Sequence, residues 1–383
     1  MTSGSPSRGL EIAARMRQLR IGVNALYLIP GCVGGTEIYL CNLMRALGEV
    51  DSANEYFLFT NLETGNSLAP GKPNFHTVQQ AVRAAFRPAR IAWEQMALPL
   101  AVAAHRIDVL LNPGFTAPIL CGCPQVTVFH DLQHRRHPEH FRRFDLPFWR
   151  WLLFWSAHIS RMLIADSVAT REDLERFYRL PQDRMRVVPL GVEPEFFEIV
   201  RRPEPFLLSV STLHPHKNLD RLLRVFAAFR RTRPELRLVI AGLRGFDTDH
   251  LHALRQELGL AESVEFTGWV PREELYDLYA RALAFVYPST FEGFGLPVLE
   301  ALAAGVPAAC SRIEPLASMA ADAALQFDPA NEREMARVIE QIVCDESLRG
   351  GLAAAGPKRA ASFSWNATAR ATLAALVEAT ERN

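Results

Sequence analysis

The sequence predicts an α/β protein made of two doubly wound domains, each built on a mostly parallel β-sheet. Short apolar runs that are typical of buried strands alternate with longer amphipathic segments that are typical of helices. The alternation begins near Ile21 and restarts after residue 200, next to the charged, proline-rich segment 201–205. The chain of 383 residues is long enough for two or three domains of ordinary size, and the single restart favours two.

The restart of the pattern also sets the expected domain boundaries. Residues 1–20 are polar, contain four arginines and lack an uninterrupted apolar core, so no secretory signal is expected there. A final helix closes the chain. The expected parts are a disordered or loosely ordered segment 1–20, an N-terminal domain 21–200, a C-terminal domain 201–365 and a final helix 366–383.

Composition excludes some classes of function. Hydrophobic residues make up 49% of the chain and the formal net charge is zero, which indicates a soluble globular protein and argues against a nucleic-acid partner. The six cysteines lack the spacing of a zinc site, so we expect no metal and a reducing, cytoplasmic compartment.

The first predicted strand, residues 21–28, leads through a glycine-rich segment into an amphipathic helix. Gly34 and Gly35 stand at this junction and permit close approach of the backbone. The start of a helix presents unpaired N–H groups and a positive dipole end, which favour an anionic ligand. A Gly-Gly pair before a helix is also common as a simple turn, so both interpretations stay open at this point.

Further strands are expected at residues 55–60, 75–79 and 107–113, with a helix over 91–105. The next apolar run, PQVTVFHDL, ends in His130 and Asp131. Ligands of parallel sheets lie at the carboxyl ends of the strands, so His130 is a candidate site residue. A lone histidine at a strand end is otherwise more often structural.

Residues 134–155 are basic and aromatic together. Two interpretations stay open: this face rests on anionic lipid headgroups, or it is a solvated loop followed by a core helix, which we favour. The most apolar region, residues 146–164, is interrupted by Arg150, His158 and Arg161, so no membrane-spanning segment is expected.

The second half opens with a strand to Val210, a loop containing Thr212, and a helix that starts at Lys217 and Asn218. A lysine at the start of a helix opposes the helix dipole, so its presence favours a phosphate between the two. Downstream, residues 247–249 read Asp-Thr-Asp ahead of a helix, and we interpret them as a helix cap rather than as a metal site.

Residues 288–305, PSTFEGFGLPVLEALAAG, predict the end of a buried strand, a glycine-rich loop and a short helix with Pro297 in its first turn. The start of this helix is another anion site. Glu292 lies in the loop and Glu300 follows eight residues later, so two carboxylates flank the site. A carboxylate accepts hydrogen bonds from two hydroxyl groups at once, which suits a sugar.

This arrangement resembles the Glu-x7-Glu motif of retaining glycosyltransferases of family 4. The resemblance implies the GT-B architecture, in which two doubly wound Rossmann-like domains face each other across a cleft. Family members often return the last helix to the first domain, so the resemblance implies the same for residues 366–383. It extends over nearly the whole chain and is strongest from residue 208 to residue 329. HPHKN at residues 214–218 is similar to the phosphate loop of the family, and the segment 185–197 is similar to its interdomain linker, with Leu190 where asparagine is usual.

The resemblance implies a role for each matching residue. Glu292 and the backbone at Gly293, Phe294, Gly295 and Leu296 would hold the sugar hydroxyls, and Glu300 would hold the ribose. Lys217, with Gly34 and Gly35, would bind the diphosphate, and backbone near Val270 the nucleobase. His130 would lie at the sugar near the scissile bond.

Two departures from the family pattern bear on the phosphate loop. Ser211 replaces a glycine, and His216 replaces an arginine. Thr212 stands near the place of a second arginine that other members have. We therefore expect a weaker diphosphate site, or one that Arg244 completes.

The expected function is that of a retaining glycosyltransferase that moves a hexose, mannose as the first guess, from a nucleotide diphosphate sugar to a saccharide or lipid-linked saccharide. No cofactor or metal is expected. The expected location is cytoplasmic, with contact at the inner face of the cell membrane left open. Alternatives are a sugar-nucleotide 2-epimerase, which needs no acceptor, and a catalytically silent sugar-nucleotide-binding subunit, against which Lys217, Glu292 and Glu300 argue.

Overall fold

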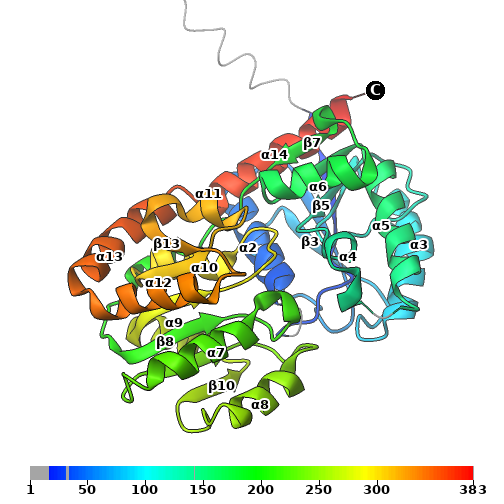
Figure 1. Ribbon diagram of the computed structural model, residues 1–383. Coiled ribbons are helices and arrows are strands. Elements are labelled where there is room, and N and C mark those ends of the chain that lie inside the picture. Colours follow the sequence, from blue (N-terminus) through cyan, green and yellow to red (C-terminus); the bar gives the residue numbers. More distant parts are fainter. Residues whose placement is uncertain (1–16, 32–33, 142, 383) are drawn as a thin grey trace, which may run out of the picture.

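The computed structural model describes residues 17–31, 34–141 and 143–382. It contains two parallel β-sheets, one in each half of the chain, and helices cover both faces of each sheet (Figure 1). These are the two doubly wound domains that the alternating pattern predicts. The expected loosely ordered N-terminus lies outside the described residues, apart from residues 17–20.

The N-terminal sheet has seven strands in the order β3-β2-β1-β4-β5-β6-β7, and the order reverses direction between β1 and β4. Its strands are β1 (Arg20–Asn24), β2 (Glu55–Thr60), β3 (Phe75–Gln79), β4 (Val109–Asn112), β5 (Gln125–Phe129), β6 (Met162–Ala165) and β7 (Met185–Val187). Its helices are α2 (Gly35–Val50), α3 (Arg87–Ala104), α4 (Gln133–Arg136), α5 (Leu146–Ile159) and α6 (Val168–Tyr178).

The C-terminal sheet has six strands in the order β10-β9-β8-β11-β12-β13, with its reversal between β8 and β11. Its strands are β8 (Glu204–Val210), β9 (Arg237–Ala241), β10 (Val264–Gly268), β11 (Ala282–Tyr287), β12 (Ala308–Ser311) and β13 (Ala324–Phe327). The helices that follow are α7 (Leu219–Arg230), α8 (Thr248–Glu257), α9 (Arg272–Arg281), α10 (Leu296–Ala303), α11 (Leu316–Ala320), α12 (Glu332–Cys344), α13 (Glu346–Ala360) and α14 (Trp365–Glu381).

Some predicted boundaries differ from those observed. The strand expected over residues 21–28 ends at Asn24, because the side chain of Asn61 donates to the carbonyl oxygens of Leu26 and Leu28 at 2.9 and 2.7 Å. These bonds hold the chain in a turn at the edge of the sheet. The helix expected over residues 91–105 begins four residues earlier, at Arg87.

The chain crosses between the domains twice, and the two crossings lie side by side. The segment after β7 meets the segment before α14 through a backbone bond from Val192 to Phe363 at 3.3 Å. Thr368 of α14 donates to the carbonyl oxygen of Pro189 at 2.7 Å. Helix α14 then packs on α2 and on strands β4, β5 and β6, so the last helix lies on the N-terminal domain (Figure 1).

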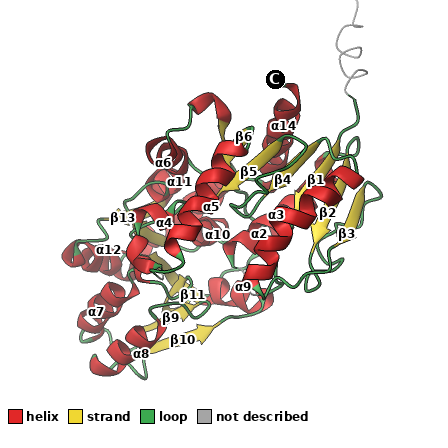
Figure 2. Cartoon of the chain, turned by 90° about the vertical axis from the view of Figure 1, so that its right-hand side faces the viewer, coloured by secondary structure: helices red, strands yellow, loops and turns green. Residues whose placement is uncertain are grey.

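Helices α3 and α5 lie next to each other on the outside of the N-terminal domain (Figure 2). Helix α5 covers most of the apolar region 146–164, and β6 covers the rest. No helix in the described ranges is both long and apolar enough to cross a membrane.

A substitution at Gly191 can test how closely the two crossing segments pack. A Cβ atom at this position would lie 2.1 Å from the backbone nitrogen of Trp365. We expect Gly191→Ala to lower the free energy of unfolding by about 1 to 3 kcal/mol, because backbone has to move to admit the methyl group. Urea unfolding measures this difference.

The matched control is Gly350→Ala in α13, where a Cβ atom would meet nothing within 4 Å. Alanine should stabilise that helix by up to about 1 kcal/mol. Equal unfolding of the two variants would show that the crossings are not closely packed.

Candidate active site

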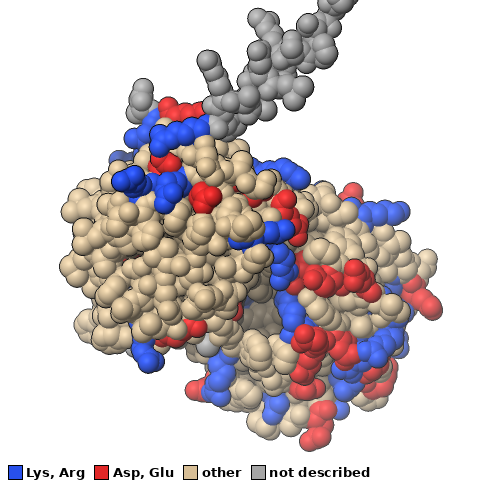
Figure 3. Space-filling model, turned by 180° about the vertical axis from the view of Figure 1, so that it is seen from behind, with Lys and Arg blue, Asp and Glu red and all other residues tan. Residues whose placement is uncertain are grey.

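Segments that follow β5 of the N-terminal sheet meet the loops after β8 and β11, the strands at the reversal of the C-terminal sheet, between the domains. Gln133 of the N-terminal domain donates to Nδ1 of His216 in the C-terminal domain at 2.9 Å. The rings of His137 and Phe291 meet edge to face at 5.3 Å. Seen from behind, a hollow lies between the two lobes (Figure 3). Parallel sheets bind ligands at such reversals, outside the carboxyl ends of the strands.

The glycine-rich loop after β11 is held by backbone contacts. Ser289 and Thr290 both donate to the carbonyl oxygen of His216, at 3.1 and 3.0 Å through their hydroxyl groups. A Cβ atom on Gly293 would lie 1.8 Å from the carbonyl oxygen of His130, so only glycine permits this approach between the domains. Gly295 has φ +104° at the N-cap of α10, a conformation that glycine adopts without strain.

Lys217 and Glu292 form an ion pair at the centre of these loops. Lys217 Nζ donates to Glu292 Oε1 at 2.6 Å and to the hydroxyl oxygen of Tyr287 at 3.0 Å. The two charged side chains are only 14% and 10% exposed. The buried carboxyl of Asp131 belongs to the same electrostatic cluster, and burial raises its pKa above the usual value. A cation and two acids thus lie together at the cleft.

Glu300 lies one turn into α10 and is buried. Tyr279 donates to its Oε2 at 3.0 Å, and Arg272 Nη2 lies 3.5 Å from its Oε1. Burial raises the pKa of Glu300 to about 7, although the positive charge of Arg272 acts in the opposite direction. Glu300 therefore changes its charge near neutral pH.

His130 has both ring nitrogens occupied. Its Nδ1 lies 2.7 Å from Asp166 Oδ2, and its Nε2 lies 2.9 Å from the carbonyl oxygen of Pro113. Both partners are acceptors, so the geometry fits an imidazolium that donates from both nitrogens. The rings of Tyr39 and Phe115 pack edge to face on it, at 4.8 and 5.0 Å. The side chain is therefore bonded within the N-terminal domain, and its carbonyl oxygen faces Gly293.

The remaining predicted residues fall into two groups. Gly34 and Gly35 stand at the start of α2, where a Cβ atom would meet nothing within 4 Å, so a ligand has room beside the backbone. Thr212 is in the loop that leads from β8 to Lys217, and its carbonyl oxygen accepts from the His214 backbone at 2.8 Å.

Other predicted residues lie farther from the ion pair or offer only backbone. Arg244 is 76% exposed and pairs with Asp249 at 3.1 Å, so its side chain points to solvent. Val270 and Leu296 pack against the core of the domain, and Phe294 is buried with its ring edge to face with Phe363. The polar groups that these three residues can offer to a ligand are those of the backbone.

Several residues of the site were missed in the sequence. Tyr287, Asp166 and Arg272 each bond directly to a predicted residue. Asp166 follows β6 as His130 follows β5, and the two strands are neighbours in the sheet, so their position at adjacent strand ends was an available signal. Tyr287 and Arg272 have no comparable signal.

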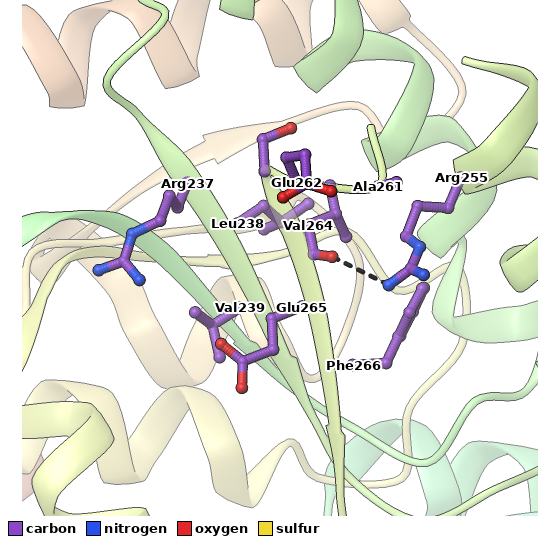
Figure 4. Close-up of a pocket in the computed structure, with 10 residues that line it drawn as sticks. Arg237, Leu238, Val239, Arg255, Ala261, Glu262, Val264, Glu265 and Phe266 are labelled. Atoms are coloured by element: carbon purple, nitrogen blue, oxygen red, sulfur yellow. Dashed lines mark hydrogen bonds between the residues drawn. The ribbon is translucent and has the colours of Figure 1, made fainter. Parts of the chain in front are cut away.

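Another hollow, of about 250 Å³, lies at the amino ends of β9 and β10 (Figure 4). It is lined by Arg237, Glu262 and Arg255, and Arg255 donates to the carbonyl oxygen of Val264 at 3.2 Å. This is the edge of the sheet opposite to the loops above, so the hollow is not part of the candidate site. In the part of the chain that the structure describes, no cluster of three His, Cys, Asp or Glu residues is placed to hold a metal.

The fold and site define a class: proteins with two Rossmann-like domains of the GT-B type and a ligand site between them. Family models agree with this class. The model "Glycosyltransferase Family 4" matches residues 33–196, and the model "Glycosyl transferases group 1" matches residues 193–359. The chain therefore belongs to the glycosyltransferases with a family 4 N-terminal half and a group 1 C-terminal half.

Among curated proteins, the chain is similar to O-antigen chain mannosyltransferase B of Escherichia coli, with 32% identity over 63% of this chain and 66% of that one. It is also similar to D-inositol 3-phosphate glycosyltransferase of Stackebrandtia nassauensis, with 32% identity over 58% of this chain and 55% of that one. The matched part of the chain thus spans between 55 and 66% of the length of these relatives.

Solved structures with low sequence identity share the fold. Sucrose-phosphate synthase from Thermosynechococcus elongatus superposes with a TM-score of 0.75 at 19% identity, covering 94% of this chain and 98% of that one. HepE from Anabaena, in complex with UDP and glucose, superposes with a TM-score of 0.73 at 18% identity, covering 94% and 100%. The expected GT-B architecture is confirmed.

The pKa of His130 offers a test of the site geometry. Burial alone lowers the pKa of a histidine, and the charge and hydrogen bond of Asp166 outweigh burial here, so the pKa is above its usual value. In Asp166→Asn the charge that raises the pKa of His130 is removed, so we expect this pKa to fall below the value in the unchanged protein. Histidine NMR titration measures the change.

The raised pKa of His130 also determines how the stability of the fold depends on pH. A histidine whose pKa rises on folding stabilises the fold fully below the unfolded pKa, and this contribution is lost as pH rises through the folded value. The internal reference is His134, whose pKa burial lowers to about 3 and which should stay neutral in both proteins. An unchanged His130 titration in Asp166→Asn would contradict the described bond.

Proposed function

We propose that this chain is a retaining glycosyltransferase that transfers a hexose from a nucleoside diphosphate sugar to a hydroxyl group of a saccharide or lipid-linked saccharide. Mannose from GDP-mannose is the first candidate, because the E. coli relative is named as an O-antigen chain mannosyltransferase. The Lys217–Glu292 pair supports the proposal most. It puts a cation and a carboxylate side by side at the sheet reversal, where a diphosphate and a sugar need one each.

Donor binding would exchange the partners of this pair. The diphosphate takes the place of Glu292 on Lys217 Nζ, and Glu292 is then free to accept hydrogen bonds from the sugar hydroxyls. Negative charge builds on the diphosphate as it leaves. Lys217, the backbone N–H groups at Gly34 and Gly35 and the start of α10 stabilise that charge.

The transfer itself breaks the bond from the anomeric carbon to the diphosphate oxygen and forms a bond from that carbon to the acceptor oxygen on the same face. The acceptor proton passes to the departing phosphate oxygen, so this route requires no protein nucleophile. His130 meets Gly293 through its backbone carbonyl oxygen, and its ring is paired with Asp166 within the N-terminal domain. The proposal requires no metal ion.

A donor screen tests the proposed reaction. Purified protein is mixed with each common nucleotide sugar, with and without candidate acceptors, and release of nucleoside diphosphate is followed in the presence of EDTA. We expect release from one donor, and a loss of about a hundredfold or more in Lys217→Ala and Glu292→Ala, because each removes charge stabilisation or sugar positioning.

Arg244→Ala is the matched control, since that side chain points to solvent and should leave the rate within about twofold. Dependence on added metal would contradict the metal-free route. Release of an altered sugar nucleotide without acceptor would indicate an epimerase, and tight donor binding without any release would indicate a silent binding subunit.

We also propose that the N-terminal domain rests on an anionic membrane surface. Four aromatic side chains, Phe144, Phe148, Trp151 and Trp155, recur at helical spacing along α5 and the turn before it, and they are 41 to 96% exposed. Met96 and Leu100 of α3, the helix next to α5 in Figure 2, are also exposed. Exposed tryptophan and phenylalanine on one helix face are typical of helices that lie in the lipid headgroup region.

Charge supports the same partner. Arg143 is exposed at the start of this aromatic face, and Arg87 lies over the ring of Trp149 at 3.9 Å. A surface of this kind at the inner face of the cell membrane would bring a lipid-linked acceptor to the cleft.

Vesicle binding tests the membrane surface. We expect sedimentation with phosphatidylglycerol vesicles, weaker sedimentation with phosphatidylcholine alone, and a loss of about tenfold or more in Trp151→Ser with Trp155→Ser, because two interfacial rings are removed. The control is Phe197→Ser, which removes a ring of equal exposure, 41%, from the segment between the domains. Equal vesicle binding by both variants would contradict the proposed membrane surface. A dimer of the protein that the tryptophan substitutions dissociate would also contradict it.

A further inference from the structure

Arg272, the first residue of α9, lies between two acidic side chains from different parts of the chain. Its Nε donates to Glu193 Oε2 at 3.0 Å, and its Nη2 donates to Glu193 Oε1. The same Nη2 lies 3.5 Å from Glu300 Oε1. The guanidinium therefore makes a two-point bond to Glu193 and a longer contact to Glu300.

The two acids connect Arg272 to both domains. Glu300 is on α10, which starts at the glycine-rich loop of the candidate site. Glu193 is in the first crossing segment and accepts a hydrogen bond of 2.9 Å from Asn42 Nδ2. Asn42 is on α2, which starts at Gly35 on the other side of the cleft. A continuous row of polar contacts thus joins the donor side of the cleft to α2.

Glu300 is the less satisfied of the two acids. Its Oε2 accepts from Tyr279 at 3.0 Å, whereas its Oε1 has the longer contact of 3.5 Å to Arg272. Glu193 receives hydrogen bonds from Arg272, Asn42 and Tyr276, and the charge of Arg272 together with these bonds outweighs burial and lowers the pKa of Glu193. The two hydroxyl groups of a ribose would supply what Glu300 lacks.

We propose that Arg272 is a positioning residue that keeps Glu300 ionised for the ribose of the donor and couples occupancy of the donor site to α2 through Glu193 and Asn42. The inference rests on the proposed function, because it assumes that Glu300 meets the donor. When ribose hydroxyls bind Glu300, the guanidinium of Arg272 gives up its long contact to Glu300 and keeps its two-point bond to Glu193. Coupling between two sites is reciprocal. Loss of the hydrogen bond from Asn42 to Glu193 should therefore weaken donor binding, although Asn42 does not contact the donor.

Calorimetric binding of UDP and of GDP, measured at several pH values on both sides of 7, tests the role of Arg272. Glu300 faces Arg272 and Tyr279 of α9, Glu193 of the crossing segment and Tyr287 of β11. Wild-type affinity for the tighter nucleotide should fall as the pH drops below 7, because a protonated Glu300 loses an acceptor.

Arg272→Met removes the positive charge that favours the Glu300 carboxylate, so the fall in nucleotide affinity should begin at a higher pH than in the wild type. Affinity at neutral pH should drop about tenfold. The matched control is Arg281→Met at the other end of α9, whose side chain is 31% exposed against 29% for Arg272 and pairs with Asp277 and Glu204 instead. It should bind and titrate as the wild type does.

Asn42→Ala tests the coupling. It should weaken nucleotide binding severalfold while leaving the pH midpoint in place, and its effect should be smaller when Arg272 is already methionine. Additive effects would overturn the coupling. Should Arg272→Met fail to fold, Arg272→Lys, which keeps one charge but loses the two-point bond, should show the same lost coupling to Asn42.

Two outcomes separate this inference from the proposed function. Equal nucleotide binding by Arg272→Met and Arg281→Met at every pH, with Glu300→Gln impaired, would overturn the role of Arg272 alone. Wild-type binding by Glu300→Gln, with donor turnover intact, would show that Glu300 does not meet the ribose and would overturn the inference at its base. Loss of turnover with every donor would instead reject the function.

Discussion

The ion pair between Lys217 and Glu292 is the interaction on which the organisation of the cleft depends. Removing both charges from water costs free energy, and the pair offsets that cost only because the loops hold the two groups 2.6 Å apart. Lys217 comes from the loop after β8 and Glu292 from the loop after β11, the two central strands of the C-terminal sheet. The pair therefore ties the two loops together. Under the proposed function, a diphosphate would replace Glu292 on Lys217, and sugar hydroxyls would donate hydrogen bonds to the released carboxylate.

Much of the fold follows from local pattern. The strands and helices of both domains are set largely by residues close in sequence. Ser167 caps α6 and Asn331 caps α12 through hydrogen bonds to backbone N–H groups three residues later. The glycine-rich loop with Glu292 and Glu300 belongs to the same category. The predicted end of β1 was wrong because the side chain of Asn61, which is distant in sequence, determines where this strand ends.

The partners of the site residues were the part that the sequence did not supply. His130 bonds to Asp166, which lies 36 residues away, rather than to the adjacent Asp131. Arg272 reaches Glu193 across 79 residues and Glu300 across 28. These pairings depend on which strands are neighbours and on how the domains meet, and no spacing rule encodes either property. The sequence motifs identified the candidate side chains, and the fold determines which of them contact each other.

The absence of a Cβ atom at Gly293 has a kinetic consequence. Backbone of the C-terminal domain touches the carbonyl oxygen of His130 in the N-terminal domain, so in this arrangement the two loops leave no space between them for a passing molecule. A molecule that passes between these two loops therefore requires the domains to separate there first. For that route, the frequency of the separation sets an upper limit on the rate of passage.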